Sequence, residues 1–415
     1  MDKIGEQQQS FRRATLIVAS ITNFSNTFAA SALNIAIPHI GTEYQASATS
    51  VSWIVIAFLL TAALLAIPFG RIADVYGRVP MLKYGMLLFC VTALLNMFSP
   101  NMAVFLLFRA LQGVGAAMIF ATNTAILVDA YPAEKRGSVM GIAVAAVFTG
   151  SACGPVIGGL LTHAFGWRSV FLLITAFALI ALCTAMLRLP SEKVPSVREK
   201  AGIVAVIVRL FKNRMFTISN LAALFNFAAV FAVIYLMSIY LQLARGFTAD
   251  HAGLIMITQP AIQAVLSPFA GRLSDKRQPA VIASAGMACC AGALVMFAFL
   301  GEQTSIVYIV AGLLLTGVGV ALFSSPNSNI IMSSVENMDY GVAASVMSTS
   351  RMVGQVIGMA LLTIIVNAVI GNIPISDVEP AILVLNLQVS FPIFAAICCV
   401  GILFSLNRKK SGGKS

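Results

Sequence analysis

The chain has 415 residues, of which 59% are hydrophobic and only 10% are charged. A soluble domain carries about 25% charged residues, so this composition excludes a soluble enzyme and a disordered chain. It indicates a protein whose outer surface contacts lipid. The net charge of +11 is spread over short loops, which argues against a nucleic-acid partner because no basic domain is formed.

Twelve apolar runs follow one another along the chain, each close to the roughly 20 residues that a membrane-spanning helix needs. They cover residues 14–37, 51–69, 80–98, 102–127, 138–162, 168–187, 216–240, 250–271, 280–300, 306–332, 341–370 and 384–406. None has the sustained alternation of an outer-membrane barrel strand. The sequence therefore predicts an all-α polytopic membrane protein with 12 transmembrane helices. The seven cysteines lie inside these runs, and we expect neither a metal nor a cofactor.

The distribution of positive charge predicts the orientation. Twenty-two of the 26 Lys and Arg residues fall in the two tails and in the loops after even-numbered runs, against only Arg168 and Arg245 on the other side. Because cytoplasmic loops are enriched in Lys and Arg, we expect both termini in the cytoplasm and a multi-pass protein of the cell membrane. The other two cations, Arg109 and Arg351, fall inside apolar runs.

The long polar stretch 188–215 divides the chain near its middle. We therefore predict an N-terminal six-helix bundle over 1–187, a cytoplasmic linker over 188–215, and a C-terminal six-helix bundle with a cytoplasmic tail over 216–415. Within the linker, 203–212 has the spacing of an amphipathic helix that lies at the membrane interface.

Short motifs recur in the two halves in the same order and at a nearly constant offset. Phe69–Asp74 reappears as Ala270–Asp275, Leu111–Gly115 as Leu315–Gly319, and Gly150 with Gly154 as Gly354 with Gly358. Two repeats in the same orientation predict a pseudo-two-fold axis along the membrane normal, an arrangement that rocks about a site at mid-membrane.

Three motifs of the first half, after the second run and within the fourth and fifth runs, are candidates for conformational change. After the second run, two glycines permit a tight turn and a carboxylate stands beside arginines. In the fifth run, three glycines share one helical face, which lets another helix approach closely, and a proline removes a backbone hydrogen bond. The candidate conformational residues are Gly70, Asp74, Gly77, Arg78, Arg109, Gly113, Gly150, Gly154, Pro155, Gly158 and Gly159.

These motifs together resemble the major facilitator superfamily over essentially the whole chain. The 70–78 stretch resembles motif A, 109–115 resembles motif B, and 150–159 resembles motif C, the signature associated with drug:proton antiporters. Leu33–Pro38 resembles a branch usually built with fourteen helices, whereas this length accommodates twelve. The resemblance implies alternating access and a proton as the coupling ion. Three positions depart from the family pattern. Val75 and Val79 stand where the family often has basic residues, and Ala29 stands where related exporters often have an acid.

In that superfamily helices 1, 4, 7 and 10 line the cavity, and polar side chains recur along these and neighbouring runs at helical spacing. The candidate substrate-binding residues are Asn23, Asn26, Asn34, Gln112, Asn123, Asn226, Gln259, Gln263, Asn327, Arg351 and Gln355, with Phe24, Phe120, Phe227, Phe231 and Tyr235 as aromatic candidates. The alternative is that the amides bond neighbouring helices. The alternative for Arg109 is a structural hydrogen bond to backbone carbonyls. For Arg351 we expect a side chain that faces the cavity.

No acidic residue or histidine lies near the middle of any run. The charges at mid-membrane are positive, so neutral or anionic substrates fit better than cations, and Asp129 and Arg109 remain as candidates for proton coupling. The sequence thus favours a monomeric secondary exporter of small amphipathic molecules in the lipid bilayer. The alternatives are an exporter dedicated to one neutral or anionic metabolite, a membrane enzyme, which lacks a nucleophile–base pair here, and a receptor without transport activity.

Overall fold

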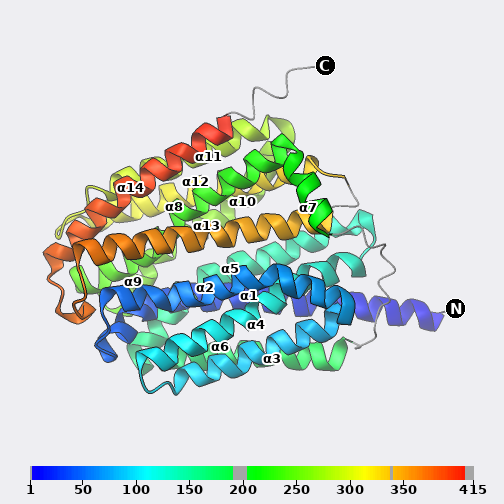
Figure 1. Ribbon diagram of the computed structural model, residues 1–415, viewed down its shortest axis with the longest axis horizontal. Coiled ribbons are helices and arrows are strands. Elements are labelled where there is room, and N and C mark those ends of the chain that lie inside the picture. The colour runs from blue at the N-terminus through cyan, green and yellow to red at the C-terminus, as the bar shows by residue number, and fades with distance from the viewer. Residues whose placement is uncertain (1, 190–202, 337–339, 407–415) are drawn as a thin grey trace. The chain divides into compact units, whose positions relative to one another are not determined.

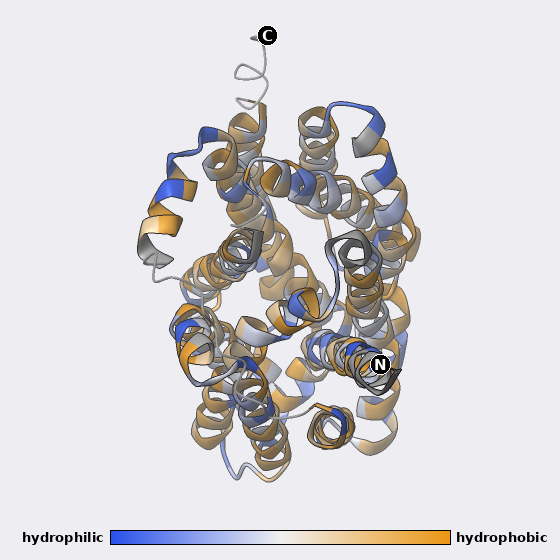
Figure 2. Ribbon diagram, turned by 90° about the vertical axis from the view of Figure 1, so that its right-hand side faces the viewer, coloured by the Kyte–Doolittle hydropathy of each residue, from blue (hydrophilic) through white to orange (hydrophobic). Residues whose placement is uncertain are grey.

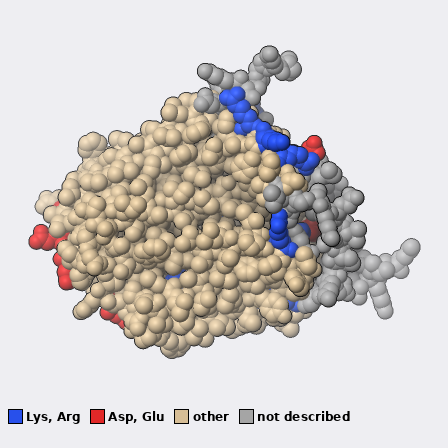
Figure 3. Space-filling model, in the orientation of Figure 1, with Lys and Arg blue, Asp and Glu red and all other residues tan. Residues whose placement is uncertain are grey.

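The computed structural model describes residues 2–189, 203–336 and 340–406 (Figure 1). Within this part of the chain, twelve helices are long and apolar enough to cross a membrane, and each matches one of the predicted runs. Figure 2 shows their residues mostly in hydrophobic colours, and the middle of the face drawn in Figure 3 is almost free of charged side chains. The predicted fold class is confirmed.

The helices of the first half precede residue 189. They are α1 (Asp2–Glu43), α2 (Ala48–Tyr76), α3 (Arg78–Met97), α4 (Met102–Ala130), α5 (Ala133–Phe165) and α6 (Arg168–Arg188). Those of the second half are α8 (Arg214–Ile239), η1 (Tyr240–Ala244), α9 (Ala249–Met256), α10 (Thr258–Lys276), α11 (Pro279–Phe297), α12 (Ile306–Ser333), α13 (Tyr340–Val369), η3 (Ile375–Asp377) and α14 (Pro380–Leu406).

Two spans depart from a simple helix. The eighth span is broken at Ile257 between α9 and α10, because Pro260 has no N–H to donate to the carbonyl of Met256. The seventh span ends in the π-turn η1. The first helix begins at Asp2, so the polar N-terminal tail continues it instead of preceding it as a separate segment.

By its contacts the chain forms two compact units. Unit 1 comprises Met1–His39 and Trp53–Arg198, and unit 2 comprises Ile40–Ser52 and Glu199–Ser415. The α1–α2 connection (Ile40–Ser52) therefore groups with the second half of the sequence. Of the predicted linker 188–215, residues 190–202 lie outside the described residues.

The described part of the linker contains α7 (Ile203–Lys212). Its Leu210 is buried against Phe216 and Ile331, and Val206 and Ile207 pack on the same cluster. The predicted helix is thus present, with one apolar face against unit 2. Its position at a membrane interface stays a prediction.

Backbone pairing fixes the α1–α2 connection to the segment before α14. The N–H of Ile375 donates to the carbonyl of Ala46 at 3.0 Å, and the N–H of Ala48 donates to the carbonyl of Ile373 at 3.3 Å. An isolated antiparallel bridge joins Ser47 to Pro374. All of these contacts lie within unit 2.

The same close helix crossings recur in the two units. In unit 1, a Cβ on Gly150 would lie 2.4 Å from the carbonyl oxygen of Phe24, so α5 packs directly on the α1 backbone. In unit 2, a Cβ on Gly354 would lie 2.5 Å from the carbonyl oxygen of Leu224, so α13 packs in the same way on α8. Small residues permit such approaches between membrane helices, and their recurrence supports the two sequence repeats.

Candidate conformational and substrate sites

The proline of α5 is joined to α1 by a hydrogen bond. Pro155 lies inside the helix and has no N–H for the carbonyl of Ser151, four residues earlier. The hydroxyl of Ser31 on α1 donates to that carbonyl at 2.9 Å, so a side chain of the neighbouring helix replaces the missing N–H donor. The nearby Gly154 is equally constrained, because a Cβ there would lie 2.5 Å from the Cβ of Ser31.

The other glycines of the predicted conformational set divide into two groups. Gly113 and Gly158 lie at close crossings, where an added Cβ would come within 2.0 Å of the Thr61 hydroxyl and 2.8 Å of Ala32. Gly159 is buried in α5. Gly70, predicted as a turn residue, is instead inside α2 with room for a Cβ, because the apolar helix continues past it to Tyr76.

The turn between α2 and α3 rests on Gly77, whose φ of +104° is a conformation that side-chain-bearing residues rarely adopt. Directly after it, Arg78 forms an ion pair with Asp129 at the end of α4. The side chain of Asp74 lies outside the described residues. The structure thus unites one predicted conformational residue with the coupling candidate Asp129, which is half exposed at a helix end rather than deep in a span.

A second tie joins the same end of α4 to α1. The Arg12 guanidinium donates to the carbonyl of Ala130 at 2.9 Å, and the Tyr131 hydroxyl donates to the carbonyl of Arg12 at 2.8 Å. Burial raises the pKa of the Tyr131 hydroxyl, against the lowering influence of Arg12 and Arg13. The tyrosine therefore stays neutral and remains a hydrogen-bond donor at neutral pH.

Arg109 is buried and held by groups of unit 1. Its guanidinium donates to the carbonyl of Ile54 at 3.1 Å and to the side-chain oxygen of Gln112 at 2.6 Å. It also lies over the Phe58 ring, with 4.5 Å between the guanidinium carbon and the ring centroid. These contacts favour the structural alternative for Arg109, a bond to a backbone carbonyl that ties α4 to α2.

The amides predicted to line a cavity in unit 1 are engaged with neighbouring helices. Asn123 of α4 donates to the side-chain oxygen of Asn23 on α1 at 2.9 Å, and Asn23 donates to the carbonyl of Ala143 on α5 at 3.2 Å. Asn34 donates to the carbonyl of Ala30 within its own helix at 2.8 Å. The bonds of Asn123 and Asn23 are the interhelical bonding that membrane helices often use, whereas the bond of Asn34 stays within α1.

Asn26 and Asn226 each lie inside one unit. Asn26 faces the interior of unit 1, at a cavity of about 10 Å³ that Phe89 of α3 and Ala178 of α6 also line. Asn226 is fully buried in unit 2, 4.0 Å from the sulfur of Cys398 on α14. Their side-chain nitrogens have no hydrogen-bond acceptor within the described chain. Their role in substrate binding stays a prediction, and helical spacing alone does not reveal which neighbour each residue faces.

Arg351 has a different environment from Arg109. It lies on the face of α13 that carries Gly354 and Gly358, the face that packs on α8, yet its side chain is exposed. Its guanidinium carbon lies 6.0 Å from the centroid of Phe227 on α8. Within the described residues no acceptor or carboxylate bonds it. An arginine in a span needs such a partner or water, so this side chain is available to a ligand.

The Phe227 ring beside Arg351 also contacts α12. Phe227 meets the Phe323 ring of α12 edge to face, with 6.3 Å between centroids. Asn327 follows Phe323 by one turn of α12, and its side-chain oxygen has no donor among the described residues. Gln355 follows Arg351 by one turn of α13 and is half-buried. The sequence did not single out Phe323, because it is one of 27 phenylalanines.

The remaining candidates lie on α10. Gln259 is buried in its first turn, where its carbonyl would lie 2.6 Å from a Cβ on Gly317 of α12. Gln263 is half-buried one turn later, and its carbonyl accepts a hydrogen bond from Ser267. No described contact joins either glutamine to Arg351, so their role in substrate binding stays a prediction.

Comparisons with known proteins agree with this architecture. A family model described as the Major Facilitator Superfamily matches residues 19–359 and 219–414. The chain is 27% identical to the riboflavin transporter RibZ of Clostridioides difficile, covering 96% of this chain and 98% of RibZ. It is 27% identical to the multidrug resistance protein Stp of Mycobacterium tuberculosis, covering 84% and 74%. A bacterial homolog of the human lysosomal transporter Spinster, solved in an inward-facing and occupied conformation, shares the fold with a TM-score of 0.80 at 17% identity, covering 97% of each chain.

Proposed function

The chain belongs to the major facilitator superfamily of transporters, and from this premise we propose that it exports small amphipathic molecules across the cell membrane by alternating access. Both termini lie in the cytoplasm, as the bias of Lys and Arg toward one set of loops supports. The similarity to Stp supports a multidrug type of efflux. The chain acts as a monomer.

One observation carries the choice of substrate: the accessible cation Arg351 beside the Phe227 ring. The ring offers an apolar face for a planar molecule, and the guanidinium offers donors in a fork that matches planar acceptors. Cations are disfavoured by the same charge, because no acid lies near the middle of any span. The substrates are therefore planar, acceptor-rich and neutral or anionic, and the similarity to a riboflavin transporter favours a flavin-like ring as the first compound to test.

The driving force belongs to the same proposal. Proton entry drives export, as the resemblance of 150–159 to motif C supports. Asp129 and Arg109 remain the coupling candidates, but their ties to Arg78 and to Ile54 favour a role in which they change partners during the cycle. A second candidate function, export of one dedicated neutral or anionic metabolite, is favoured by the close side-chain packing around Phe227 and Phe323.

The test is transport by the purified protein in liposomes under an imposed pH gradient. Riboflavin, the anion fluorescein and the cation ethidium are compared, with protein-free liposomes as the control. We expect gradient-dependent transport of riboflavin and fluorescein, and transport of ethidium slower by at least severalfold. Equal transport of ethidium contradicts the charge preference, and transport that persists after an uncoupler collapses the gradient contradicts proton coupling. Transport of one compound alone favours the dedicated exporter.

A further inference from the structure

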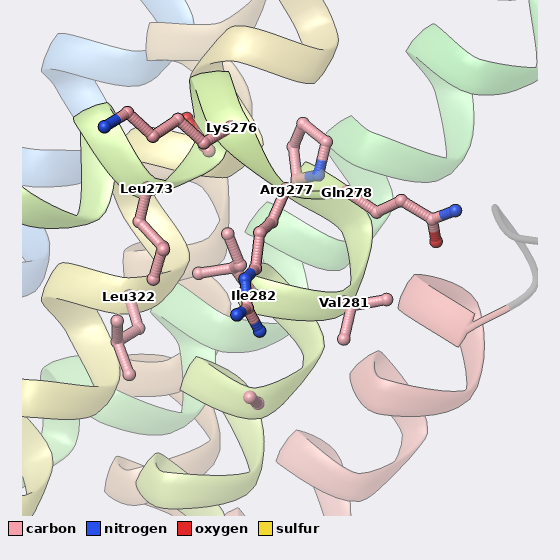
Figure 4. Close-up of a pocket in the computed structure, with 10 residues that line it drawn as sticks. Leu273, Lys276, Arg277, Gln278, Val281, Ile282 and Leu322 are labelled. Carbon is pink, nitrogen blue, oxygen red and sulfur yellow. The ribbon is translucent and has the colours of Figure 1, made fainter.

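An open groove lies in unit 2 where α10 ends and α11 begins (Figure 4). Its volume is about 870 Å³, and residues of α10, α11 and α12 line it. Among the described lining residues there are two cations, Lys276 and Arg277, and no carboxylate. The groove differs in its lining from the set around Arg351, because none of Arg351, Phe227, Phe323, Asn327 and Gln355 lines it.

The side chain of Arg277 points into this groove. Figure 4 shows it running toward Ile282, whereas Lys276 and Gln278 point away on either side. A long cation at a membrane surface ordinarily extends away from the apolar region and keeps its charge in water. The Arg277 side chain extends toward it instead, and within the described residues no hydrogen bond or ion pair engages its guanidinium. The guanidinium is thus placed to bind an anion from outside the chain.

The walls below Arg277 are apolar and reach into the membrane-spanning region. Ile282 and Ala285 lie in the first two turns of α11, and Leu322 lies 11 residues before the end of α12, roughly 16 Å along the helix at 1.5 Å per residue. Leu273 and Val281 at the margin are 41% and 47% exposed. A ligand that contacts every part of the groove has an anionic head and an apolar tail.

The other half of the sequence provides an internal comparison. At the offset of 201 that relates the repeats here, Lys276 and Arg277 correspond to Val75 and Tyr76. Both of those side chains are exposed, at 78% and 69%. The two cations thus have no counterpart at the matching positions of unit 1, where Val75 is itself a departure from the family pattern.

We propose that this groove binds an anionic phospholipid of the cytoplasmic leaflet, with its phosphodiester against Arg277 and an acyl chain along Ile282, Ala285 and Leu322. Basic pockets between helices on this side of a membrane are suited to such head groups. Lys276 at the margin adds to the positive potential without direct contact. This inference rests on the proposed orientation, which puts the α10–α11 connection in the cytoplasm.

Retention of lipid by the purified full-length protein in native mass spectrometry tests the proposal. Phosphatidylglycerol is compared with phosphatidylcholine, and Arg277→Gln with Arg214→Gln, which removes an exposed cation at the start of α8 that does not line the groove. We expect Arg277→Gln to weaken retention of phosphatidylglycerol by about fivefold or more, since one cation near the surface is worth about 1 kcal/mol. Arg214→Gln leaves retention unchanged, and phosphatidylcholine is retained weakly by all three proteins.

A second variant tests the acyl chain. Ala285→Phe fills the apolar wall without altering charge, and it should weaken phosphatidylglycerol retention although Arg277 is intact. Equal loss in Arg277→Gln and Arg214→Gln, or full retention in Ala285→Phe, overturns the lipid site. Competition by inorganic phosphate at millimolar concentration also overturns it, because the ligand is then a free anion. None of these readings uses transport, so they stand apart from the test of the proposed function.

Discussion

Arg109 and Arg351 are the same residue type inside membrane spans, yet their surroundings assign them different tasks. Arg109 satisfies its donors on Ile54 and Gln112, whereas Arg351 lies beside Phe227 with its side chain exposed. Placing a cationic side chain in the middle of a span costs at least about 2.5 kcal/mol of free energy, unless the charge is paired or contacts water. Protein groups stabilise the charge of Arg109, and water or substrate stabilises the charge of Arg351.

Replacing Arg351 with Ala should weaken binding of neutral acceptor-rich and anionic substrates by at least about tenfold, because a charge-assisted hydrogen bond is worth about 1.5–3 kcal/mol. Arg351→Lys should restore only part of the affinity, since an ammonium lacks the planar fork. Binding of riboflavin and fluorescein to purified variants, together with their thermal stability, provides the measurement. A stable Arg351→Ala protein with unchanged affinities removes this residue from the substrate site.

The Ser31–Ser151 hydrogen bond predicts a coupling between two substitutions. Ser31→Ala leaves the carbonyl of Ser151 unpaired in a buried position, which costs about 1–3 kcal/mol in the free energy of unfolding. In a Pro155→Ala background the N–H of residue 155 is restored and can donate to that carbonyl, so Ser31→Ala should then cost clearly less. A double-mutant cycle of unfolding free energies measures the difference. Equal costs in both backgrounds mean that Ser31 does not compensate for Pro155.

These residues also define the limits of sequence analysis. Pro155 revealed that a carbonyl would lack its helical partner, but the donor, Ser31, is 120 positions away in sequence and only the fold brings it there. Asn26 shared a polar stripe with Asn23, but a stripe does not identify the helix that each residue faces. Whether an arginine in a span is bonded to the chain or exposed likewise depends on neighbours such as Ile54 and Phe227. These neighbours carry no distinctive sequence signal.

At the scale of the element, glycine faces determine how closely helices cross. The face of α5 containing Gly150, Gly154 and Gly158 meets α1, and its counterpart on α13 meets α8. The halves differ in one respect, because position 359 of α13, the counterpart of Pro155, is Met. The close crossing of α5 is therefore repeated on α13, whereas the proline of α5 is not.

Gly154→Leu should abolish or strongly reduce transport, because even a Cβ there lies 2.5 Å from Ser31 and α5 must move away from α1. Gly141→Leu on the same helix is the matched control, since nothing lies within 4 Å of a Cβ at that position. Transport is measured in liposomes and normalised to folded protein, with Gly154→Ala as a milder step. Full transport by Gly154→Leu contradicts a role for the close α1–α5 crossing.

Element prediction from the sequence succeeded where one physical property decides the outcome. Spans follow from about 20 apolar residues in a row, so all twelve were predicted. Turns and helix breaks depend on the backbone conformation of single residues. Gly70 and Gly77 look equivalent in sequence, but only Gly77 adopts a positive φ, because the apolar stretch before it holds α2 helical. The break at Ile257 depends on Pro260, which the apolar run alone does not reveal.

At the scale of the whole molecule, the sequence repeats and the contact units do not coincide. The repeats assign residues 40–52 to the first half, but their contacts group them with unit 2. Side chains add to the backbone pairing there. The hydroxyl of Ser52 bonds that of Tyr235 at 3.1 Å, and Thr49 donates to the side-chain oxygen of Asn367 at 3.4 Å. If the connection moves with the first half while the halves rock, these contacts must break and reform.

A disulfide between Thr49→Cys and Asn367→Cys should therefore stop transport, because it holds the α1–α2 connection on unit 2 in every state. Reduction with dithiothreitol should restore transport, and each single variant should remain active under oxidation. Transport is followed in liposomes alongside a gel assay for the crosslink, in a background with the seven native cysteines replaced. Undiminished transport by fully crosslinked protein means that the connection stays in place throughout the cycle.

The bridge between Ser47 and Pro374 also has a consequence for biosynthesis. The two residues are separated by roughly 330 positions, which a ribosome needs about 15–65 s to translate at 5–20 residues per second. Throughout that interval the connection after the first span has been made but its pairing partner has not. This pairing therefore waits until the segment between α13 and α14 has been synthesised, and a nascent chain stalled within α13 leaves the backbone groups of residues 46–48 without these partners.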